Sequence, residues 1–320
     1  MQTVYVAGGA GFIGSHICKR LLDDGYSVVC IDNFLTSSKK NIDSFIDNKQ
    51  FHFLQKDVLQ LNEKDLEDLP TPQYILHLAS PASPNINSAR SYMSFPIETL
   101  RVNSHGTYLL LNIAKNTNAK FLFASTSEVY GDPEISPQTE EYWGRVNPNG
   151  IRSVYDEGKR FGEAITMSYV RKFGLDARIA RIFNTYGPNM QIDDGRVVSN
   201  FVVQALHNEP LSIYGEGKQT RSFCYVSDLV EGLMKLLFTE NRKGAVINLG
   251  NPIEKSIIEF AQIILQLTGS SSEIKFEALP DDDPTQRKPD ITKAKQLLDW
   301  EPKVGLEEGL QKTIQYFKSL

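Results

Sequence analysis

The sequence predicts an α/β protein with a doubly wound parallel sheet and a second, smaller C-terminal lobe. Short apolar runs alternate with segments of helical periodicity as far as about residue 183, and this rhythm stops after Tyr186-Gly-Pro188. Strands that alternate with helices form right-handed βαβ units, which build a parallel sheet. The expected strands lie in the runs VYVAG from residue 4, SVVCID from 27, FHFLQKDV from 51, YILHLAS from 74, KFLFAST from 120 and ARIARIF from 177.

The composition is that of an ordinary globular protein. The 320 residues are 41% hydrophobic, and 34 Lys and Arg face 39 Asp and Glu. The resulting net charge of -5 offers no global attraction to nucleic acid or to an anionic membrane. Cys18, Cys30 and Cys224 lie far apart without CxxC spacing, so we expect buried, reduced thiols and a cytoplasmic location. The first strand begins near Thr3 and no apolar stretch approaches the ~20 residues of a membrane span, so we expect neither a signal peptide nor a membrane partner.

A glycine-rich turn connects the first strand to the first helix. The run Gly8-Gly-Ala-Gly11-Phe-Ile-Gly14 fits GxxGxxG and precedes a helix expected over Ser15 to Asp24. Such glycines permit a tight turn, let backbone N–H groups approach a pyrophosphate, and let the helix pack against the strand. Asp32 ends the next strand, where its carboxylate can accept both ribose hydroxyls and would repel a 2'-phosphate. The pattern predicts a Rossmann domain that binds NAD.

A second motif predicts proton-transfer chemistry. Tyr155-Asp-Glu-Gly-Lys159 places a phenol and an ammonium four residues apart, on one face of a helix. To act as a base near neutrality the phenol's pKa must fall by about three units, roughly 4 kcal/mol. A unit charge about 4 Å away at an effective dielectric near 20 supplies ~4 kcal/mol. We therefore expect Lys159 to lower the pKa of Tyr155.

The end of the fifth strand carries further polar groups. Ser125-Thr-Ser-Glu-Val-Tyr-Gly131 falls at the carboxyl end of the strand, where ligands collect in open α/β sheets. Thr126 can hydrogen-bond the reacting oxygen while Tyr155 takes its proton. Glu128 offers a carboxylate to the same crevice, although a strand-end cap or a surface acid is an alternative interpretation.

These motifs lie in a chain that resembles the extended short-chain dehydrogenase/reductases, and among them the UDP-glucuronic acid decarboxylases, over nearly its whole length. After Thr126 the chain has Ser127-Glu128, as decarboxylases do, where sugar 4,6-dehydratases carry Asp-Glu. The stretch from Asn85 to Phe95 is longer than the family's. The matching segments are GGAGFIGSH at 8, DNF at 32, HLASPASP at 77, ASTSEVYGDP at 124, EYWGRVNP at 141, YDEGKR at 155, ARIFNTYGP at 180, DGRVVSNF at 194, QTRSFCYVSDLVEG at 219, INLGNP at 247 and RKPDITKAK at 287.

The resemblance implies a reaction on a UDP-sugar. Tyr155 would remove the O4 proton of UDP-glucuronate while C4 gives hydride to NAD, and the 4-keto acid would lose carbon dioxide. The enolate would be held by Thr126 and protonated Tyr155, and the 4-ketone would be reduced by the same NADH to give UDP-xylose.

The resemblance also implies the residues of each site. The catalytic residues would be Thr126, Ser127, Glu128, Tyr155, Lys159 and Arg287. NAD would contact Gly8, Gly11, Phe12, Ile13, Gly14, Asp32, Asn33, Phe34, Thr36, Asp57, Val58, Leu78, Ser80, Tyr155, Lys159 and Thr185. The UDP-sugar would contact Arg101, Glu128, Tyr155, Tyr169, Asn184, Arg196, Tyr214, Gln219, Arg221 and Arg287. No metal is expected, because the acidic run Asp281-Asp-Asp283 is more typical of a solvated turn before Pro284.

The expected organisation is two-part. Residues 1–183, with about 224–250, would form the NAD-binding domain, and 184–223 with 251–320 the sugar-nucleotide-binding lobe. The resemblance implies a homodimer through helices at about 97–117 and 154–173. Three alternative functions stay open: an oxidative decarboxylase that releases the 4-keto pentose, a UDP-glucuronate 4-epimerase, and a non-catalytic NAD-binding regulator.

Overall fold

A computed structural model of the protein describes residues 1–278 and 286–320. The acidic run Asp281–Asp283, expected to be a solvated turn, lies outside the described residues. No helix in the described part of the chain is long and apolar enough to cross a membrane.

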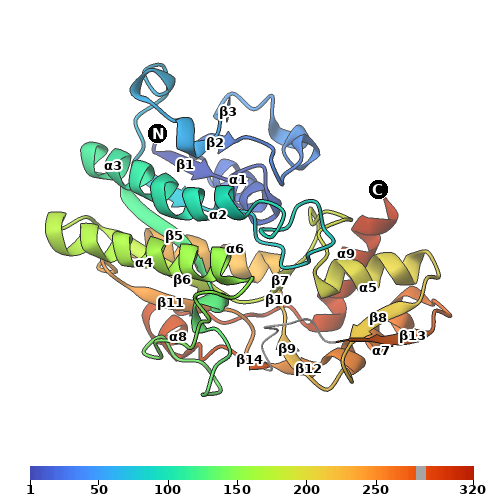
Figure 1. Ribbon diagram of the computed structural model, residues 1–320. Helices are drawn as coiled ribbons and strands as arrows, with labels where there is room; N and C mark the ends of the chain where they lie inside the picture. The colour runs from blue at the N-terminus through green and yellow to red at the C-terminus, as the bar shows by residue number, and fades with distance from the viewer. Residues whose placement is uncertain (279–285) are drawn as a thin grey trace.

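A seven-stranded sheet forms the centre of the larger part of the molecule (Figure 1). Its strand order is β11-β6-β5-β4-β1-β2-β3, and every neighbouring pair is parallel. The six strands predicted from the apolar runs are all present, and β11 adds a seventh beside β6. The strands are β1 Thr3–Ala7, β2 Ser27–Asp32, β3 Phe51–Gln55, β4 Tyr74–His77, β5 Lys120–Thr126, β6 Ala177–Ile182 and β11 Val246–Leu249.

Both faces of this sheet are covered, which explains why its strands are apolar throughout. Successive residues of a strand point to opposite faces, so Val4 and Val6 join one buried cluster while Tyr5 and Ala7 join the other. Helices α1 and α6 pack on the first face, and α3 and α4 on the second. The helices are α1 Phe12–Asp23, α2 Pro96–Arg101, α3 Thr107–Thr117, α4 Ser153–Phe173, α5 Val197–Leu206, α6 Val226–Phe238, α7 Ile257–Thr268, α8 Thr292–Leu298 and α9 Leu306–Lys318, with a π-helical turn, η5 Val102–Gly106, between α2 and α3.

Helix α1 begins at Phe12, three residues before the predicted start at Ser15. The extended backbone of Gly11 precedes the helix, and its carbonyl accepts a hydrogen bond from Ser15 N at 2.9 Å. The glycine turn therefore runs directly into the helix, because the last glycine of the motif already has helical geometry.

The smaller part of the molecule contains short strands and helices that lie beside the carboxyl ends of the central strands (Figure 1). Strand β9 pairs with β12 in antiparallel fashion and with β14 in parallel, which sets Arg287 opposite Arg221. Helices α5 and α7 pack together next to the β8 and β13 pair. The strands of this part are β7 Thr185–Tyr186, β8 Leu211–Tyr214, β9 Thr220–Ser222, β10 Cys224–Tyr225, β12 Glu254–Ser256, β13 Ile274–Glu277 and β14 Gln286–Arg287.

Candidate active site

The glycine turn is packed too tightly for side chains. Gly8 has a φ of +82°, and a Cβ on Gly14 would lie 2.1 Å from the carbonyl oxygen of Gly8. Helix α1 begins just beyond, at Phe12, and no side chain caps its first N–H groups in the described structure. This arrangement leaves a backbone surface and a helix N-terminus open to an anionic group, as in a site for a pyrophosphate.

Asp32 contacts the glycine turn through a hydrogen bond from Ala10 N. Its carboxylate accepts hydrogen bonds from Ala10 N at 3.0 Å, Phe34 N at 2.9 Å and Ser37 Oγ at 2.6 Å. Burial raises the pKa of Asp32, while these hydrogen bonds act in the opposite direction. The side chain is 7% exposed, at the end of β2 where a ribose was predicted.

Four residues predicted to contact NAD beyond Asp32 are held by contacts within the protein and do not line the cavity described below: Asn33, Phe34, Asp57 and Val58. Asn33 Nδ2 donates to Asp57 Oδ2 at 3.1 Å, and Asp57 Oδ1 accepts from Leu59 N at 2.8 Å. Phe34 packs against Phe53, with ring centroids 5.1 Å apart. Val58 is buried in the core, so its side chain is occupied by packing.

Tyr155 and Lys159 lie on the first turns of α4, and both are buried. The ammonium of Lys159 donates to the carbonyl oxygen of Ala124 at 2.8 Å, and its Nζ is 5.7 Å from the Tyr155 ring centroid. Burial lowers the pKa of Lys159 to about 7, although Glu163 acts to raise it.

The pKa of Tyr155 departs from the sequence expectation. Burial and then the carboxylate of Glu128 raise the pKa of Tyr155 above its ordinary value, and a hydrogen bond with Thr126 lowers it only in part. Desolvation of the phenolate therefore outweighs the hydrogen bond with Thr126 and the positive charge of Arg196, and Lys159 is not among the main causes of the shift. The expected lowering of the Tyr155 pKa by Lys159 is therefore wrong for the described structure.

Glu128 joins two arginines in a buried cluster. Arg287 Nη1 donates to Glu128 Oε1 at 2.6 Å, and Arg152 Nη2 donates to Oε2 at 2.5 Å. Burial alone would raise the pKa of Glu128, but the two guanidinium groups outweigh it and hold the pKa well below its ordinary range. Glu128 is thus neither a surface acid nor a simple strand cap.

Sequence reasoning missed two residues of this cluster. Arg152 lies three residues before Tyr155, and this helical spacing was the only available signal. Tyr92 stacks face to face on Tyr155, with ring centroids 4.9 Å apart and planes within 3°. Tyr92 comes from the long stretch at 85–95, for which no motif predicted a role.

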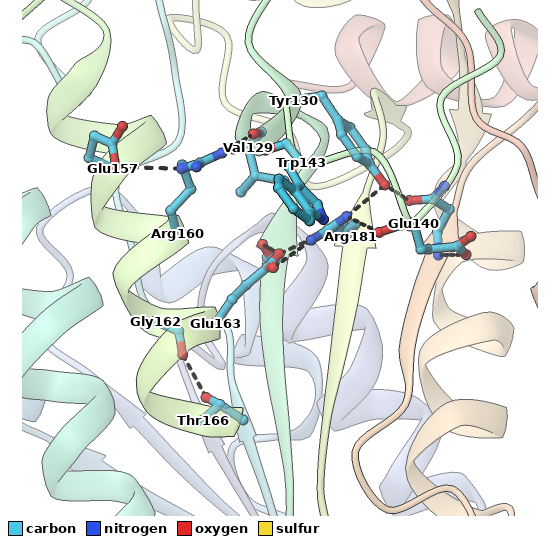
Figure 2. A network of polar contacts seen from close by, with 12 residues as sticks. Val129, Tyr130, Glu140, Trp143, Glu157, Arg160, Gly162, Glu163, Thr166 and Arg181 are labelled. Atoms are coloured by element: carbon cyan, nitrogen blue, oxygen red, sulfur yellow. Dashed lines mark hydrogen bonds and ion pairs between the residues drawn. The ribbon is translucent and has the colours of Figure 1, made fainter. Parts of the chain in front are cut away.

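A second layer of polar contacts holds the strand end against α4 (Figure 2). Glu163 accepts hydrogen bonds from Arg181 Nη2 at 2.7 Å and Nε at 2.9 Å, and from Ser125 Oγ at 2.5 Å. Arg181 also donates to Tyr130 Oη at 3.0 Å. Since Ser125 directly precedes Thr126, this network holds the end of β5, where Thr126 was predicted to act, against α4.

A cavity of about 600 Å³ lies between the glycine turn, the end of β5 and the start of α4, and its size suits a cofactor or a drug-sized ligand. Asp32 is not among the residues of its wall. Of the predicted residues, its wall includes Gly8, Gly11, Phe12, Ile13, Gly14, Thr36, Leu78, Ser80, Thr126, Ser127, Glu128, Tyr155, Lys159, Asn184, Thr185, Arg196, Tyr214, Gln219, Arg221 and Arg287.

Two predicted sugar contacts do not line this cavity. Arg101 is an exposed residue at the end of α2. Tyr169 lies on α4 fourteen residues beyond Tyr155, roughly 21 Å along the helix axis, and its hydroxyl donates to Asn112 Oδ1 at 2.7 Å. Helical rise carries Tyr169 away from the site although both tyrosines share one helix.

The far end of the cavity is basic and comes from the smaller lobe. Arg196 forms two contacts with Asp194, at 2.5 and 2.7 Å, and Arg221 Nη1 donates to Thr220 O at 2.9 Å. Gln219 Nε2 donates to the carbonyl oxygen of Tyr214 at 2.7 Å. Two guanidinium groups in one wall suit phosphate oxygens, which they can bind bidentately.

The stretch at 85–95, which the resemblance predicts to be longer than in the family, also lines the cavity. Arg90 Nε pairs with Asp193 Oδ1 at 2.9 Å, and Asn85 Nδ2 donates to Gly195 O at 3.1 Å. These contacts tie the stretch to the loop that carries Arg196. This stretch therefore forms part of the wall beside the predicted sugar-nucleotide site.

Comparisons with known proteins agree with this geometry. A family model described as GDP-mannose 4,6 dehydratase matches residues 5–313. UDP-glucuronic acid decarboxylase 1 of Xenopus tropicalis is 51% identical over 317 residues, which cover 99% of this chain and 72% of that protein. UDP-glucuronic acid decarboxylase 4 of Arabidopsis thaliana is 50% identical over 98% of this chain and 68% of its own length. A solved UDP-glucuronic acid 4-epimerase of Bacillus cereus, in complex with UDP-glucuronic acid and NAD, has a TM-score of 0.88 at 32% identity, with 99% of both chains covered.

Proposed function

Because this chain belongs to the GDP-mannose 4,6-dehydratase family, and within it to the UDP-glucuronic acid decarboxylases, we propose that it converts UDP-glucuronate to UDP-xylose with NAD as a regenerated cofactor. One observation carries the proposal: a phenol suited to a sugar hydroxyl, Tyr155, shares a cavity with a buried arginine suited to a carboxylate, Arg287. Oxidation at C4 would make the carboxylate β to a ketone, and such an acid loses carbon dioxide readily.

The glycine turn and Asp32 fit NAD. A Cβ on Gly14 would collide with the Gly8 carbonyl, so the turn keeps the bare backbone that a pyrophosphate needs. The carboxylate of Asp32 suits a free ribose and disfavours a 2'-phosphate. NAD, when bound, would supply the oxidation at C4 and the later reduction at the same carbon.

Tyr155 would take the proton of the sugar O4 and return it at the end of the cycle. Thr126, which lines the same cavity as Tyr155, would hold the reacting oxygen. Lys159 is buried near both, with its ammonium fixed on the Ala124 carbonyl. The positive charges brought by the cofactor and by protonated Lys159 would lower the pKa of Tyr155, which burial raises in the ligand-free protein.

Arg287 would bind the substrate carboxylate and would keep its hydrogen bond to Glu128. Its Nη1 is engaged by Glu128, but its buried Nε has no hydrogen-bond partner among the described residues. An unpaired buried donor is costly, so a ligand oxygen here gains the stabilisation that the ligand-free protein lacks. Ser127 lies on the same wall and would contact the sugar.

The UDP part would lie against the smaller lobe. Arg196 and Arg221 would pair with the diphosphate, and Tyr214 and Gln219 would contact the nucleoside. Asn184 lies on the same wall. Within this proposal, residues 1–183 with about 224–250 act as the cofactor domain, and the remainder acts as the sugar-nucleotide lobe.

We further propose a homodimer that pairs through α2, α3 and α4. Large apolar side chains are exposed along these helices, at Ile97, Leu100, Tyr108, Phe161 and Phe173. Light scattering on the protein as it elutes from a size-exclusion column tests this proposal. A single chain has a mass of 36.0 kDa, so a homodimer should have twice that mass. The free, buried cysteines support a reducing compartment such as the cytoplasm.

Proton NMR of UDP-glucuronate incubated with the purified protein and catalytic NAD tests the reaction. UDP-xylose without accumulation of NADH is the expected result. A 4-keto pentose with stoichiometric NADH would indicate the oxidative decarboxylase, and UDP-galacturonate would indicate the epimerase. No turnover, with NAD still bound, would indicate the regulator.

A further inference from the structure

The segment that connects β4 to α2 contains a compact loop whose two ends lie together. Ser91 Oγ donates to the carbonyl oxygen of Ser83 at 2.9 Å, and Tyr92 N donates to the same oxygen at 3.1 Å. Surface loops closed at their base in this way hold their shape as units and are frequently functional. Residues 83–95 are called the strap below.

The base of the strap lies against the tyrosine that is proposed to act on the sugar. Tyr92 is fully buried, and its ring is stacked on that of Tyr155, with centroids 4.9 Å apart and planes within 3°. Such a stack is a favourable contact between the two rings beyond the area that it buries. The base of the strap is therefore fixed beside the phenol that would meet the sugar O4.

The tip of the strap lies between the cavity and solvent. Ile86 lines the cavity and is also 63% exposed, and Asn87 likewise lines the cavity and is exposed. Between this tip and the base, Arg90 and Met93 line the cavity as well. The strap thus extends along the wall from the neighbourhood of the phenol to the solvent side.

Polar contacts join the strap to the loop at 193–195 in the smaller part of the molecule. Arg90 Nε lies 2.9 and 3.0 Å from the two carboxylate oxygens of Asp193, and Ser88 Oγ donates to the Asp193 carbonyl oxygen at 2.7 Å. The strap follows β4 of the central sheet, so these contacts bridge the two parts of the molecule beside the cavity (Figure 1).

Loss of carbon dioxide removes a group that holds the sugar in the proposed reaction. Arg287 would bind the substrate carboxylate, and this charge-assisted contact ends when C6 leaves. The sugar ring of the remaining 4-keto pentose carries no charge, and only its diphosphate is still held by arginines. Two errors can follow: release of the ketone before it is reduced, or rotation of the ring, which presents the other face of C4 to the hydride.

We propose that the strap, held by the Arg90–Asp193 pair, is the specificity-determining wall that keeps the 4-keto pentose in one orientation until C4 is reduced. This inference rests on the proposed decarboxylase function. Loops that close over an active site commit the bound molecule to the next step. With the ketone oxygen held at Tyr155, the hydride returns to the face of C4 that it left. If the ketone escapes, that hydride stays on the cofactor, so each escaped ketone leaves one NADH.

The test compares Arg90→Ala, Asp193→Ala and the double variant with wild type. The two side chains are 30% and 55% exposed, so the loss of either should have little effect on stability. The matched control is Arg145→Ala, which removes an arginine from a pair with Glu134 that is also exposed. Among the described residues, neither member of this control pair lines the cavity.

The first readout is the partition of the product. With UDP-glucuronate and NAD in excess, NMR measures the free 4-keto pentose and the 4-epimer of UDP-xylose per carbon dioxide released, and absorbance at 340 nm counts the NADH left behind. Each single variant should raise the sum of these side products about threefold, the range of an exposed ion pair. The double variant should show the same increase of about threefold, because both changes disrupt one pair. Arg145→Ala should match wild type.

The second readout requires no reaction. Stopped-flow displacement of a fluorescent mant derivative of UDP by excess UDP, from the NAD-loaded protein, gives the dissociation rate constant. A strap that closes the cavity predicts dissociation about threefold faster in Arg90→Ala and in Asp193→Ala than in wild type. The control variant should dissociate at the wild-type rate.

Two results would overturn the role of the strap. One is a side-product yield and a dissociation rate within about 1.5-fold of wild type in both single variants, a smaller effect than the loss of the pair should have. The other is an effect of Arg90→Ala that Asp193→Ala does not reproduce. Among the described residues, Asp193 does not line the cavity, so that result would indicate a direct contact between Arg90 and the ligand.

The two proposals fail in different ways. A wild-type protein that releases no carbon dioxide from UDP-glucuronate overturns the proposed function, and with it the retention of a 4-keto pentose. A wild-type protein that makes UDP-xylose, beside Arg90→Ala and Asp193→Ala variants that match it in both readouts, overturns only the role of the strap.

Discussion

Glu163→Gln should strongly destabilise the protein, because it breaks a buried charge pair beside the end of β5. Glu163 and Arg181 are each 13% exposed and are joined by two hydrogen bonds, at 2.7 and 2.9 Å (Figure 2). Removing one partner of a buried pair costs about 3–5 kcal/mol of unfolding free energy, since the other charge stays buried. Arg181 would keep its hydrogen bonds to Tyr130 Oη at 3.0 Å and to Glu140 O at 3.1 Å. We therefore expect a loss of unfolding free energy at the lower end of this range, about 3 kcal/mol.

The measurement is urea unfolding of both proteins at pH 7, followed by fluorescence and circular dichroism so that coincident transitions can be verified. The matched control is Asp23→Asn, which removes a carboxylate from the Lys19–Asp23 pair, where the side chains are 56% and 57% exposed. An exposed helical pair contributes only about 0.5 kcal/mol. If Glu163→Gln lost no more than the control, solvent would already screen the pair and the reasoning from burial would be refuted.

Three further predictions follow from the site. Tyr155→Phe should lower turnover by about 10²–10⁴-fold yet leave NAD affinity unchanged in a fluorescence titration, and an unchanged turnover would remove Tyr155 as the base. Gly14→Ala should abolish NAD binding in calorimetry, because the new Cβ would lie 2.1 Å from the Gly8 carbonyl oxygen; an affinity within about threefold of wild type would show that the turn can adjust. Lys159→Met tests the pKa of Lys159, which burial lowers from 10.5 to about 7 in the ligand-free protein. Between these values the unfolded chain binds the extra proton, so wild-type stability should rise with pH through this window relative to the variant. Equal slopes of the unfolding free energy between pH 7 and 9 in the two proteins would contradict that shift.

Local sequence patterns were sufficient for six of the seven strands of the central sheet and for the glycine turn, but not for β11. The six apolar runs became strands of one parallel sheet because both of its faces are covered, which favours apolar residues at successive positions of a strand and not only at alternate ones. The glycine turn could also be predicted from the sequence, since only a residue without a Cβ fits beside the Gly8 carbonyl. The start of α1 was wrong by three residues, because the predicted turn and the helix overlap at Phe12–Gly14.

The assembly of the site depended partly on resemblance and partly on the tertiary structure. Glu128 and Arg287 were assigned to one reaction by their matching segments, although 159 residues separate them. Nothing in the sequence indicated that Arg152 binds the other oxygen of Glu128, or that Tyr92 stacks on Tyr155. Such contacts join distant segments, and spacing along the chain carries information only about neighbours on one element.

The sequence by itself determined the order of the first six strands along the chain and the backbone turn suited to NAD, because these depend on residues close together in the chain. Only the tertiary structure decided the surroundings that shift the pKa values of the polar side chains at this site. Tyr155, Lys159 and Asp156 are ordinary titratable residues in the sequence, and burial moves the pKa of each one away from its ordinary value. Desolvation is a property of the folded surroundings, which no local pattern records.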